Sequence, residues 1–333
     1  MFREMKKFAL AFIALGVMHG CDTEIDPDQN ENSGPFQEIQ WGQDVTGQLQ
    51  PWELIQYPEH TPASQVGYLD DEEVMLVIKL NGEIFTYPLK NMLVEVVNEE
   101  RGGALAAITY CPITKSSVAF DRLLGGDTLL LTASGYLLRD NLMPLDLNSG
   151  SIWSQMKLVG MYGPHDKVNA KVLPMFETSW ETVRIHFPDA WVFLHDPLQK
   201  SAWASNEEAS DDSYTDRKLG ILSRDQVEVF DPHLFSGEMV LHTTLIQPGG
   251  NVVVAGSSEK QFVVAYRTNY SMEPAGGEFP IIMRDETGTG WNIFGEAVDG
   301  ERKGEQLDSP VSYTASHWAW EALFARVSEF SPS

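Results

Sequence analysis

The chain has 333 residues and a formal net charge of −25 at pH 7. This length is enough for one large hydrophobic core or two packed subdomains. An acidic surface of this strength repels nucleic acid and anionic lipid headgroups, so we exclude nucleic acid as a partner.

The first 20 residues have the pattern of a secretory signal peptide. Three basic side chains precede an apolar run from Phe8 to Met18, which is shorter than the roughly 20 residues that a membrane-spanning helix needs. The run leads to Gly20 and Cys21 in the sequence VMHGC, which resembles the lipobox of bacterial lipoproteins. We therefore predict a signal peptide over residues 1–20 and a lipid on Cys21, which would tether the chain to a membrane surface. Ordinary signal cleavage near Cys21 is the alternative.

The segment after Cys21 is acidic and polar. Between Asp22 and Pro35 only Ile25 has a sizeable apolar side chain, so the segment cannot bury enough surface to fold. We predict a disordered acidic tether over residues 21–36. The protein is then expected to be exported and lipid-anchored to the bacterial membrane, facing the periplasm or the extracellular side.

Strands and tight turns dominate the rest of the chain. Val74–Leu80 and Glu83–Leu89 flank Asn81-Gly82, a pair that favours the type I′ turn of a β-hairpin. A further strand is predicted over Ala104–Tyr110. Cys111 then lies at the end of a strand and immediately before a proline, in a loop at a sheet edge where functional residues are often displayed.

A second hairpin and two helices are also predicted. The hairpin consists of Ser117–Leu123 and Thr128–Ala133, with two glycines at its turn. Thr178 begins a sequence with the spacing of a capping box, which ends three residues later at a glutamate and starts a helix that should stop before a proline. The second helix fits Ala315–Val327, with Trp318 among its apolar positions.

The sequence also contains an apparent internal repeat. Ser149–Trp153 (SGSIW) is echoed by Thr287–Trp291 (TGTGW), and Trp180 and Trp318 follow these two segments at the same spacing. We predict a mainly β (α+β) fold of two related antiparallel β-rich units with a few short helices, produced by internal duplication. The first unit covers residues 37–205 and the second, abbreviated unit residues 217–333, joined by a polar linker over residues 206–216. Paired tryptophans in such units either fill two equivalent cores or form a platform for a sugar or aromatic ligand.

Several blocks resemble a bacterial and archaeal family called domain of unknown function 3179. They are AITYCPITKSSVAFDR (Ala107–Arg122), the Ser134-Gly135 pair with Asn141, DLNSGSIWSQ (Asp146–Gln155), and the later TGTGW and HWAWEALF. The resemblance runs from about Val74 to Phe324. It implies that some relatives carry selenocysteine at the position of Cys111, a substitution that makes sense only for redox or nucleophilic chemistry.

The chain departs from this family at two positions. Many members have a second cysteine where Thr114 stands, and its absence excludes an internal dithiol mechanism. Members also commonly carry a histidine where this chain has Val94, before the sequence EVVN. If that histidine acts as a base or a ligand in relatives, its loss here removes that contribution.

Cys111 is the only thiol left once Cys21 is assigned to the export signal. A nearby lysine, the turn after Pro112, and the hydroxyls of Thr114 and Ser116 would favour its thiolate. We therefore predict a single-thiol oxidoreductase or peroxidase-like enzyme with Cys111 as nucleophile and Thr114 and Ser116 as hydrogen-bond donors, in which an external thiol completes the reaction. From the family blocks we add binding or orienting residues: Arg122, Ser134, Asn141, Trp153 and Gln155.

The alternative is a non-catalytic envelope lipoprotein that binds a ligand or partner. Free cysteine is among the most buried residue types, so Cys111 could instead be a packed core residue. We expect no metal and no cofactor, because the histidines show no zinc-type spacing and the chain contains no nucleotide-binding fingerprint.

Overall fold

The structure, a computed structural model, describes residues 40–195, 217–223, 226–245 and 250–332. All of them fall within the unit Ser33–Ser333. The predicted signal peptide, the tether over residues 21–36 with Cys21, and the linker over residues 206–216 lie outside the described residues. Among the described helices, none is both long and apolar enough to cross a membrane.

The predicted mainly β fold is confirmed, and its largest sheet has eight strands. In order across this sheet the strands are β2 (Ile55–Gln56), β6 (Val96–Arg101), β7 (Ala104–Cys111), β8 (Ser116–Asp121), β25 (Ser312–Ser316), β17 (Arg217–Ser223), β18 (Gln226–Phe230) and β26 (Val327–Glu329). β6, β7 and β8 form an antiparallel meander, and β8 meets β25 where Ser117 lies opposite Thr314. The two predicted units therefore contribute strands to one sheet.

The predicted hairpin at Asn81-Gly82 is present. β4 (Val74–Leu80) and β5 (Glu83–Pro88) pair antiparallel, and φ is 48° at Asn81 and 85° at Gly82, as a type I′ turn requires. These strands belong to a five-stranded sheet with the order β15-β4-β5-β16-β3. Its other strands are β15 (Met175–Ser179), β16 (Trp191–Phe193) and β3 (His60–Pro62).

The second predicted hairpin was wrong in its pairing. Across the glycine turn only β9 (Leu123–Leu124) and β10 (Asp127–Thr128) pair. Both edges of β8 are already occupied by β7 and β25, so β11 (Leu131–Leu138) pairs in a different sheet. That sheet has the order β1-β11-β12-β13-β14. Its other strands are β1 (Val45–Gly47), β12 (Asn141–Asp146), β13 (Ile152–Ser154) and β14 (Val159–Tyr162).

The C-terminal part of the chain adds two three-stranded sheets. The first consists of β19 (Glu238–Leu245), β20 (Gly250–Ser257) and β21 (Phe262–Arg267), and the second of β22 (Met272–Pro274), β23 (Ile281–Asp285) and β24 (Gly290–Asn292). Short 3₁₀ helices connect strands elsewhere: η1 (Ala63–Gln65), η2 (Leu89–Val94) and η5 (Pro232–Leu234).

Helix α1 (Trp180–His186) begins one residue later than the capping box predicts. The N-cap is Ser179, whose hydroxyl accepts a hydrogen bond from the Thr182 backbone N–H at 3.2 Å. The Thr178 hydroxyl instead donates to the carbonyl of Lys260 at 2.5 Å, because Thr178 still belongs to β15. The predicted end before Pro188 is correct.

Helix α2 (His317–Leu323) is shorter than predicted. Ala315 is part of β25 and Val327 is part of β26, so both ends of the predicted helix are strands. Trp318 is 44% exposed rather than buried. The buried tryptophan of this helix is Trp320, whose ring stacks on Tyr313 with centroids 4.7 Å apart.

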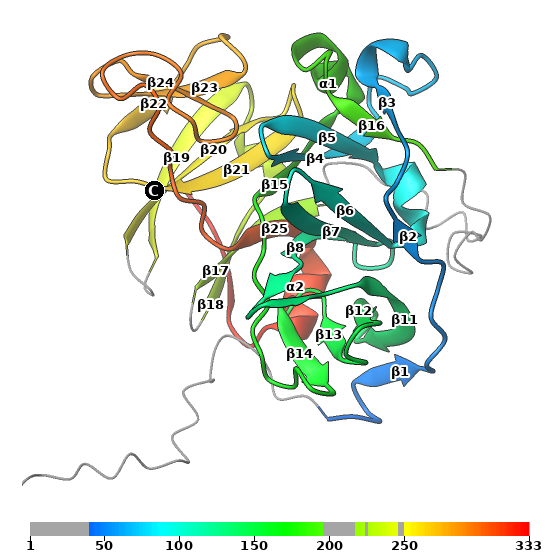
Figure 1. Cartoon of the computed structure of the whole chain (residues 1–333). Coiled ribbons are helices and arrows are strands. Elements are labelled where there is room, and N and C mark those ends of the chain that lie inside the picture. Colours follow the sequence, from blue (N-terminus) through cyan, green and yellow to red (C-terminus); the bar gives the residue numbers. More distant parts are fainter. Residues whose placement is uncertain (1–39, 196–216, 224–225, 246–249, 333) are drawn as a thin grey trace, which may run out of the picture. The chain divides into compact units, whose positions relative to one another are not determined.

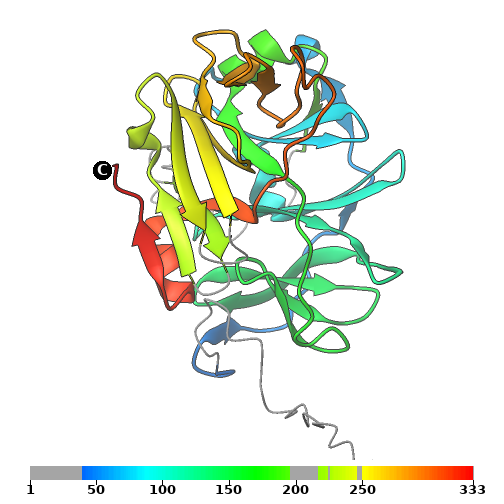
Figure 2. The same ribbon diagram turned by 90° about the vertical axis from the view of Figure 1, so that its left-hand side faces the viewer.

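Both faces of the central meander are buried. Figure 1 shows β6, β7 and β8 between the β4–β5 hairpin and the strands β11 to β14, and Figure 2 shows the same order from the side. Along β7, Ile108 and Tyr110 pack into a core with β4 and β5, whereas Ala107 and Cys111 pack into a core with β11, β12 and β13. This alternation is the two-residue period of a strand, and it directs Cys111 toward β12.

The two repeated turns share local hydrogen bonds. The Asp146 carboxylate accepts from the Ser149 hydroxyl at 2.5 Å, and the Asp285 carboxylate accepts from the Thr287 hydroxyl at 2.7 Å. The tryptophans that follow, at positions 153 and 291, are both fully buried, which places both in cores. The sheets around the two turns differ in strand number and order, and duplication of the whole units stays a prediction.

Candidate functional site

Cys111 is the last residue of β7 and lies opposite Ser116, the first residue of β8. The hairpin turn between them covers residues 112–115 and ends at Lys115, whose φ of 50° lets the chain reverse direction. Ser316 is the N-cap residue of α2, and its backbone N–H donates a hydrogen bond to the carbonyl of Thr114 at 2.9 Å. The turn that follows the cysteine is therefore fixed from both sides, by β8 and by the start of α2.

The thiol of Cys111 is buried, with 1% of the residue exposed. Its sulfur contacts the carbonyl oxygen of Asp140 at 3.5 Å, to which the S–H donates. Burial raises the pKa of Cys111, while hydrogen bonds from the Thr114 hydroxyl, the Thr114 N–H and the Leu142 N–H act in the opposite direction. The resting residue is thus a protonated thiol with donors already aimed at its sulfur.

A fully buried polar cluster adjoins this thiol. It consists of Thr114, Ser116, Asn141 and Gln155, none of which has measurable exposure. The Asn141 amide donates to the Thr114 hydroxyl oxygen at 3.0 Å and to the Gln155 side-chain oxygen at 2.8 Å. The Ser116 hydroxyl donates to the same Gln155 oxygen at 2.6 Å. Four of the predicted site residues therefore meet around Cys111.

Most protons in this cluster have a fixed direction. The Gln155 amide donates to the Thr109 hydroxyl oxygen at 2.9 Å, and the Asn141 side-chain oxygen accepts the Met156 N–H at 3.1 Å, so both amides are oriented. The Ser116 proton is directed to Gln155. The Thr114 hydroxyl, 2.9 Å from the Ser116 oxygen, can donate either to that oxygen or to the sulfur. Thr114 can therefore turn its proton from the Ser116 oxygen to the sulfur when charge develops there, and the Ser116 oxygen keeps the Asn141 amide as a donor.

Glu95 is a further charged group beside Cys111 that the sequence did not single out. It ends η2 with a φ of 66°, and its carbonyl accepts the Tyr110 N–H at 2.9 Å. Burial raises the pKa of Glu95 to about 7, and its charge in turn raises the pKa of Cys111. The sequence offered one signal for Glu95. It begins the EVVN segment and directly follows Val94, the position at which the resemblance places a histidine in relatives.

Three predicted binding residues do not join the cluster. Arg122 is buried at the end of β8, where its side chain donates to the carbonyls of Leu129 at 2.7 Å and Glu99 at 3.1 Å. The Ser134 hydroxyl accepts the Tyr136 N–H at 3.0 Å within β11. These two side chains stabilise backbone. Trp153 is fully buried in the same core as Cys111, and its indole N–H has no hydrogen-bond partner within the described ranges.

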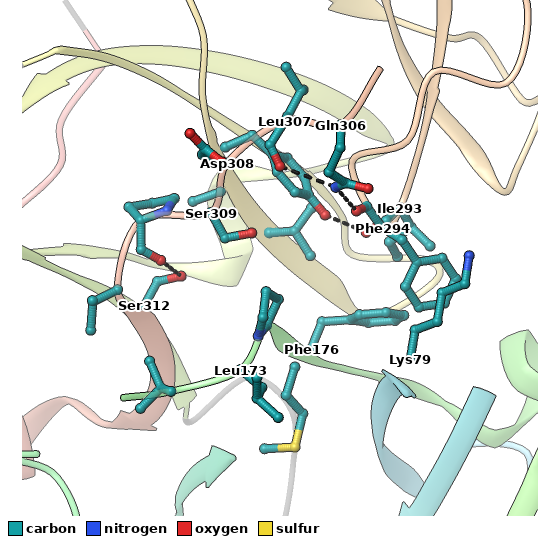
Figure 3. Close-up of a pocket in the computed structure, with 18 of the residues that line it drawn as sticks. Lys79, Leu173, Phe176, Ile293, Phe294, Gln306, Leu307, Asp308, Ser309 and Ser312 are labelled. Carbon is teal, nitrogen blue, oxygen red and sulfur yellow. Dashed lines mark hydrogen bonds between the residues drawn. The ribbon is translucent and has the colours of Figure 1, made fainter. Parts of the chain in front are cut away.

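A cavity of about 590 Å³ lies elsewhere, along β15 and β21. Leu173 and Phe176 form one side, and Ile293, Phe294, Gln306 and Leu307 form the opposite side, as Figure 3 shows. The Lys79 ammonium at its edge pairs with Glu296 at 2.5 Å. None of the predicted site residues lines this cavity.

No group of three or more histidine, cysteine, aspartate or glutamate side chains among the described residues is arranged to hold a metal ion. The arrangement around Cys111 brings together groups that take part in thiol chemistry. It combines one thiol, three donors to the sulfur, and a carboxyl group whose pKa lies near neutrality.

Comparison with known proteins gives a family but no activity. No curated protein and no solved structure matches the chain. The model of the family described as "Protein of unknown function (DUF3179)" matches residues 54–327, which include every residue of the cluster around Cys111. Because this match covers most of its length, the chain belongs to the DUF3179 family.

Proposed function

We propose that this protein is an envelope lipoprotein that reduces small peroxides with a single thiol, Cys111. The observation that carries the proposal is that the Cys111 thiol is buried against the polar cluster and that the Thr114 hydroxyl, the Thr114 N–H and the Leu142 N–H lower its pKa through hydrogen bonds. Such donors stabilise a thiolate and the charge that develops on sulfur in a reaction. A packing role for Cys111 does not require them.

The polar cluster supports this proposal because it fixes the donor geometry. Thr114 is held by Asn141, which Gln155 holds in turn, so the hydroxyl beside the sulfur sits on a buried framework. Hydrogen bonds from such supporting residues keep a catalytic group in its position. Ser116 acts through Gln155 and Thr114 and is a positioning residue.

The reaction uses two external reactants. The Cys111 thiolate attacks one oxygen of hydrogen peroxide, so that an S–O bond forms as the O–O bond breaks, and the hydroxide that leaves becomes water by taking up a proton. The sulfur is oxidised to a sulfenic acid. A low-molecular-weight thiol then forms a mixed disulfide and releases water, and a second such thiol restores Cys111 and leaves as a disulfide.

Burial selects the size of the oxidant. With only 1% of Cys111 exposed, a protein disulfide cannot reach the sulfur in this conformation, and both the peroxide and the reducing thiol must be small. The donors at the sulfur therefore serve a small oxidant better than protein disulfide exchange.

The lipid on Cys21 is also part of the proposal. Its test is incorporation of a fatty-acid label, which wild type should show and Cys21→Ala should lose.

The experiment is oxidation of the purified protein by hydrogen peroxide, followed by measurement of the intact mass and trapping of sulfenic acid. Wild type should gain one oxygen at Cys111, and Cys111→Ser should gain none at this position. Thr114→Val removes the hydroxyl donor, raises the pKa of Cys111 and should slow oxidation about tenfold, the rate equivalent of one hydrogen bond. Thr114→Ser keeps the donor and is the matched control. A wild-type Cys111 that peroxide oxidises only after unfolding would refute the proposal.

A second candidate function rests on the cavity along β15 and β21. Its volume lies within the range of small-ligand sites, and its lining mixes apolar side chains with the polar groups of Gln306 and Ser309. In this case the protein is a non-catalytic binding lipoprotein, and Cys111 is a packed core residue. The peroxide experiment separates the two functions, because a binding protein keeps its native thiol unreactive.

A further inference from the structure

Three aromatic side chains form an exposed cluster near the start of the described residues. Trp41 lies in the turn of residues 41–44 and is 45% exposed, and Tyr162, the last residue of β14, is 62% exposed. The Trp41 ring contacts the Tyr162 ring with centroids 6.2 Å apart, and it contacts the half-buried Tyr136 ring of β11 at 6.0 Å. We call Trp41, Tyr136 and Tyr162 the aromatic surface.

The five-stranded sheet brings these three rings together. Its order is β1-β11-β12-β13-β14, so β14 forms the edge opposite β1, the strand that follows Trp41. The Trp41 ring nevertheless contacts both Tyr136 on β11 and Tyr162 on β14. The register of β11 shifts between Ala133 and Leu137, an irregularity of the kind that bends a strand. The sheet therefore curls until residues from both of its edges meet at the aromatic surface.

Each ring of the aromatic surface has a polar atom that is available to an outside partner. The indole N–H of Trp41 and the hydroxyls of Tyr136 and Tyr162 make no hydrogen bond within the described ranges. A ring with such a polar tip suits the boundary between lipid and water, because the ring contacts hydrocarbon while the N–H or O–H bonds headgroups and water. Tryptophan and tyrosine are enriched at this boundary in membrane proteins.

The elements that carry the aromatic surface have no net charge. The turn of residues 41–44 and the strands β1, β11 and β14 contain one acidic side chain, Asp44, and no basic one. Asp44 is paired with Arg139 at 2.9 Å. The whole chain has a formal charge of −25, and negative charge on this scale is repelled by anionic headgroups. The aromatic surface is therefore a face on which this acidic chain can approach lipid headgroups.

We propose that the aromatic surface rests on the lipid bilayer, with its rings at the depth of the headgroups. This inference rests on the lipid anchor proposed above for Cys21, which precedes Trp41 by 20 residues. A chain of 20 residues without folded structure spans about 25 Å on average. The anchor therefore holds Trp41 and its neighbours within reach of the bilayer, where even a weak contact is favoured by the high local concentration.

The contact orients the protein on the membrane. A lipid at the end of a tether limits the distance from the bilayer but leaves the protein free to rotate, whereas three rings in the headgroup layer select one face. A flat platform for a sugar ring fits the observed geometry less well. The rings meet edge to face, with interplanar angles of 86° and 65°, and share no common plane.

The test measures quenching of tryptophan fluorescence by phosphatidylcholine vesicles with brominated acyl chains. The chain from Cys21 onward, which contains every described residue, is coupled to the vesicles by a maleimide lipid on Cys21. Cys111, 1% exposed, is out of reach of the maleimide. We expect quenching in wild type, its loss in Trp41→Phe, and its retention in Trp318→Phe, the matched control on α2 with 44% exposure. Tyr162→Ser keeps every tryptophan and should weaken the quenching.

Several results overturn the proposal. Unquenched wild type on the vesicles means that the aromatic surface does not touch lipid, and quenching unchanged in Trp41→Phe or in Tyr162→Ser means that another face does. Analytical ultracentrifugation of the uncoupled chain tests a second copy as the occupant: a dimer that Trp41→Phe dissociates would assign the surface to that contact. Because the lipid is attached chemically, this test does not depend on natural lipidation, whose own failure is a missing fatty-acid label.

Discussion

The carboxyl group of Glu95 makes the stability of the fold depend on pH. Its pKa rises from 4.5 to about 7 on folding, because burial disfavours the carboxylate. Between these two values the folded state binds more protons than the unfolded state, so stability is fully present below pH 4.5 and falls as pH rises toward 7. At 1.36 kcal/mol for each pKa unit, the loss amounts to about 3 kcal/mol.

Glu95→Gln should remove this loss. We expect the variant to be more stable than wild type by up to about 3 kcal/mol at pH 8 and nearly equal to it at pH 4.5. Urea denaturation at the two pH values measures the difference, with Glu100→Gln as control. If the stability of wild type and of Glu95→Gln depended equally on pH, burial would not destabilise the Glu95 carboxylate.

At the level of single residues, the sequence identified the members of the polar cluster, and their chemistry stays a prediction. Thr114, Ser116, Asn141 and Gln155 lie in recognisable family blocks, and their convergence on Cys111 follows from the pairing of β7 with β8 and the packing of β12 beside them. Glu95 could not be assigned in this way. Its pKa depends on burial at the end of a 3₁₀ helix, which no local pattern reports.

At the level of elements, short-range signals were accurate where both partners are adjacent in sequence. The Asn81-Gly82 hairpin formed as predicted because its turn fixes the register. The predicted partner of β11 was wrong. A strand can pair only with a sheet edge that is still free, and which edges are free depends on the tertiary structure. The end of α1 was correct, since the proline after it acts locally.

The hairpin turn gives a prediction at this scale. Gly82 has a φ of 85° and open space around its missing Cβ, so Gly82→Ala would lower stability through backbone strain alone. We expect a loss of about 1 kcal/mol in the free energy of unfolding. Gly67 also has open space but no positive φ, and Gly67→Ala should leave stability unchanged or slightly raised. Thermal unfolding of the two variants side by side checks this; equal effects would exclude strain as the cause.

At the scale of the whole molecule, one buried polar group marks the seam where β8 meets β25. The Glu177 carboxylate accepts from the hydroxyls of Ser117 at 2.7 Å and Thr314 at 2.6 Å, and it lies 3.0 Å from the Arg217 guanidinium. These four side chains come from β15, β8, β25 and β17. The seam thus joins strands of both predicted units through a single carboxylate.

This arrangement predicts that the described part of the chain unfolds as one cooperative unit and that Glu177 is essential to it. Glu177→Ala leaves the buried Arg217 without this carboxylate and should cost about 3–5 kcal/mol, whereas Glu177→Gln, which keeps an acceptor for the hydroxyls, should cost less. The control is Asp71→Ala, which breaks the exposed pair with Arg184 and should have little effect. Urea denaturation followed by tryptophan fluorescence and by circular dichroism should give coincident transitions in every variant. Two separate transitions would mean that the units on either side of the seam fold independently, and an unchanged midpoint in Glu177→Ala would mean that the seam is held by the strand ladders alone.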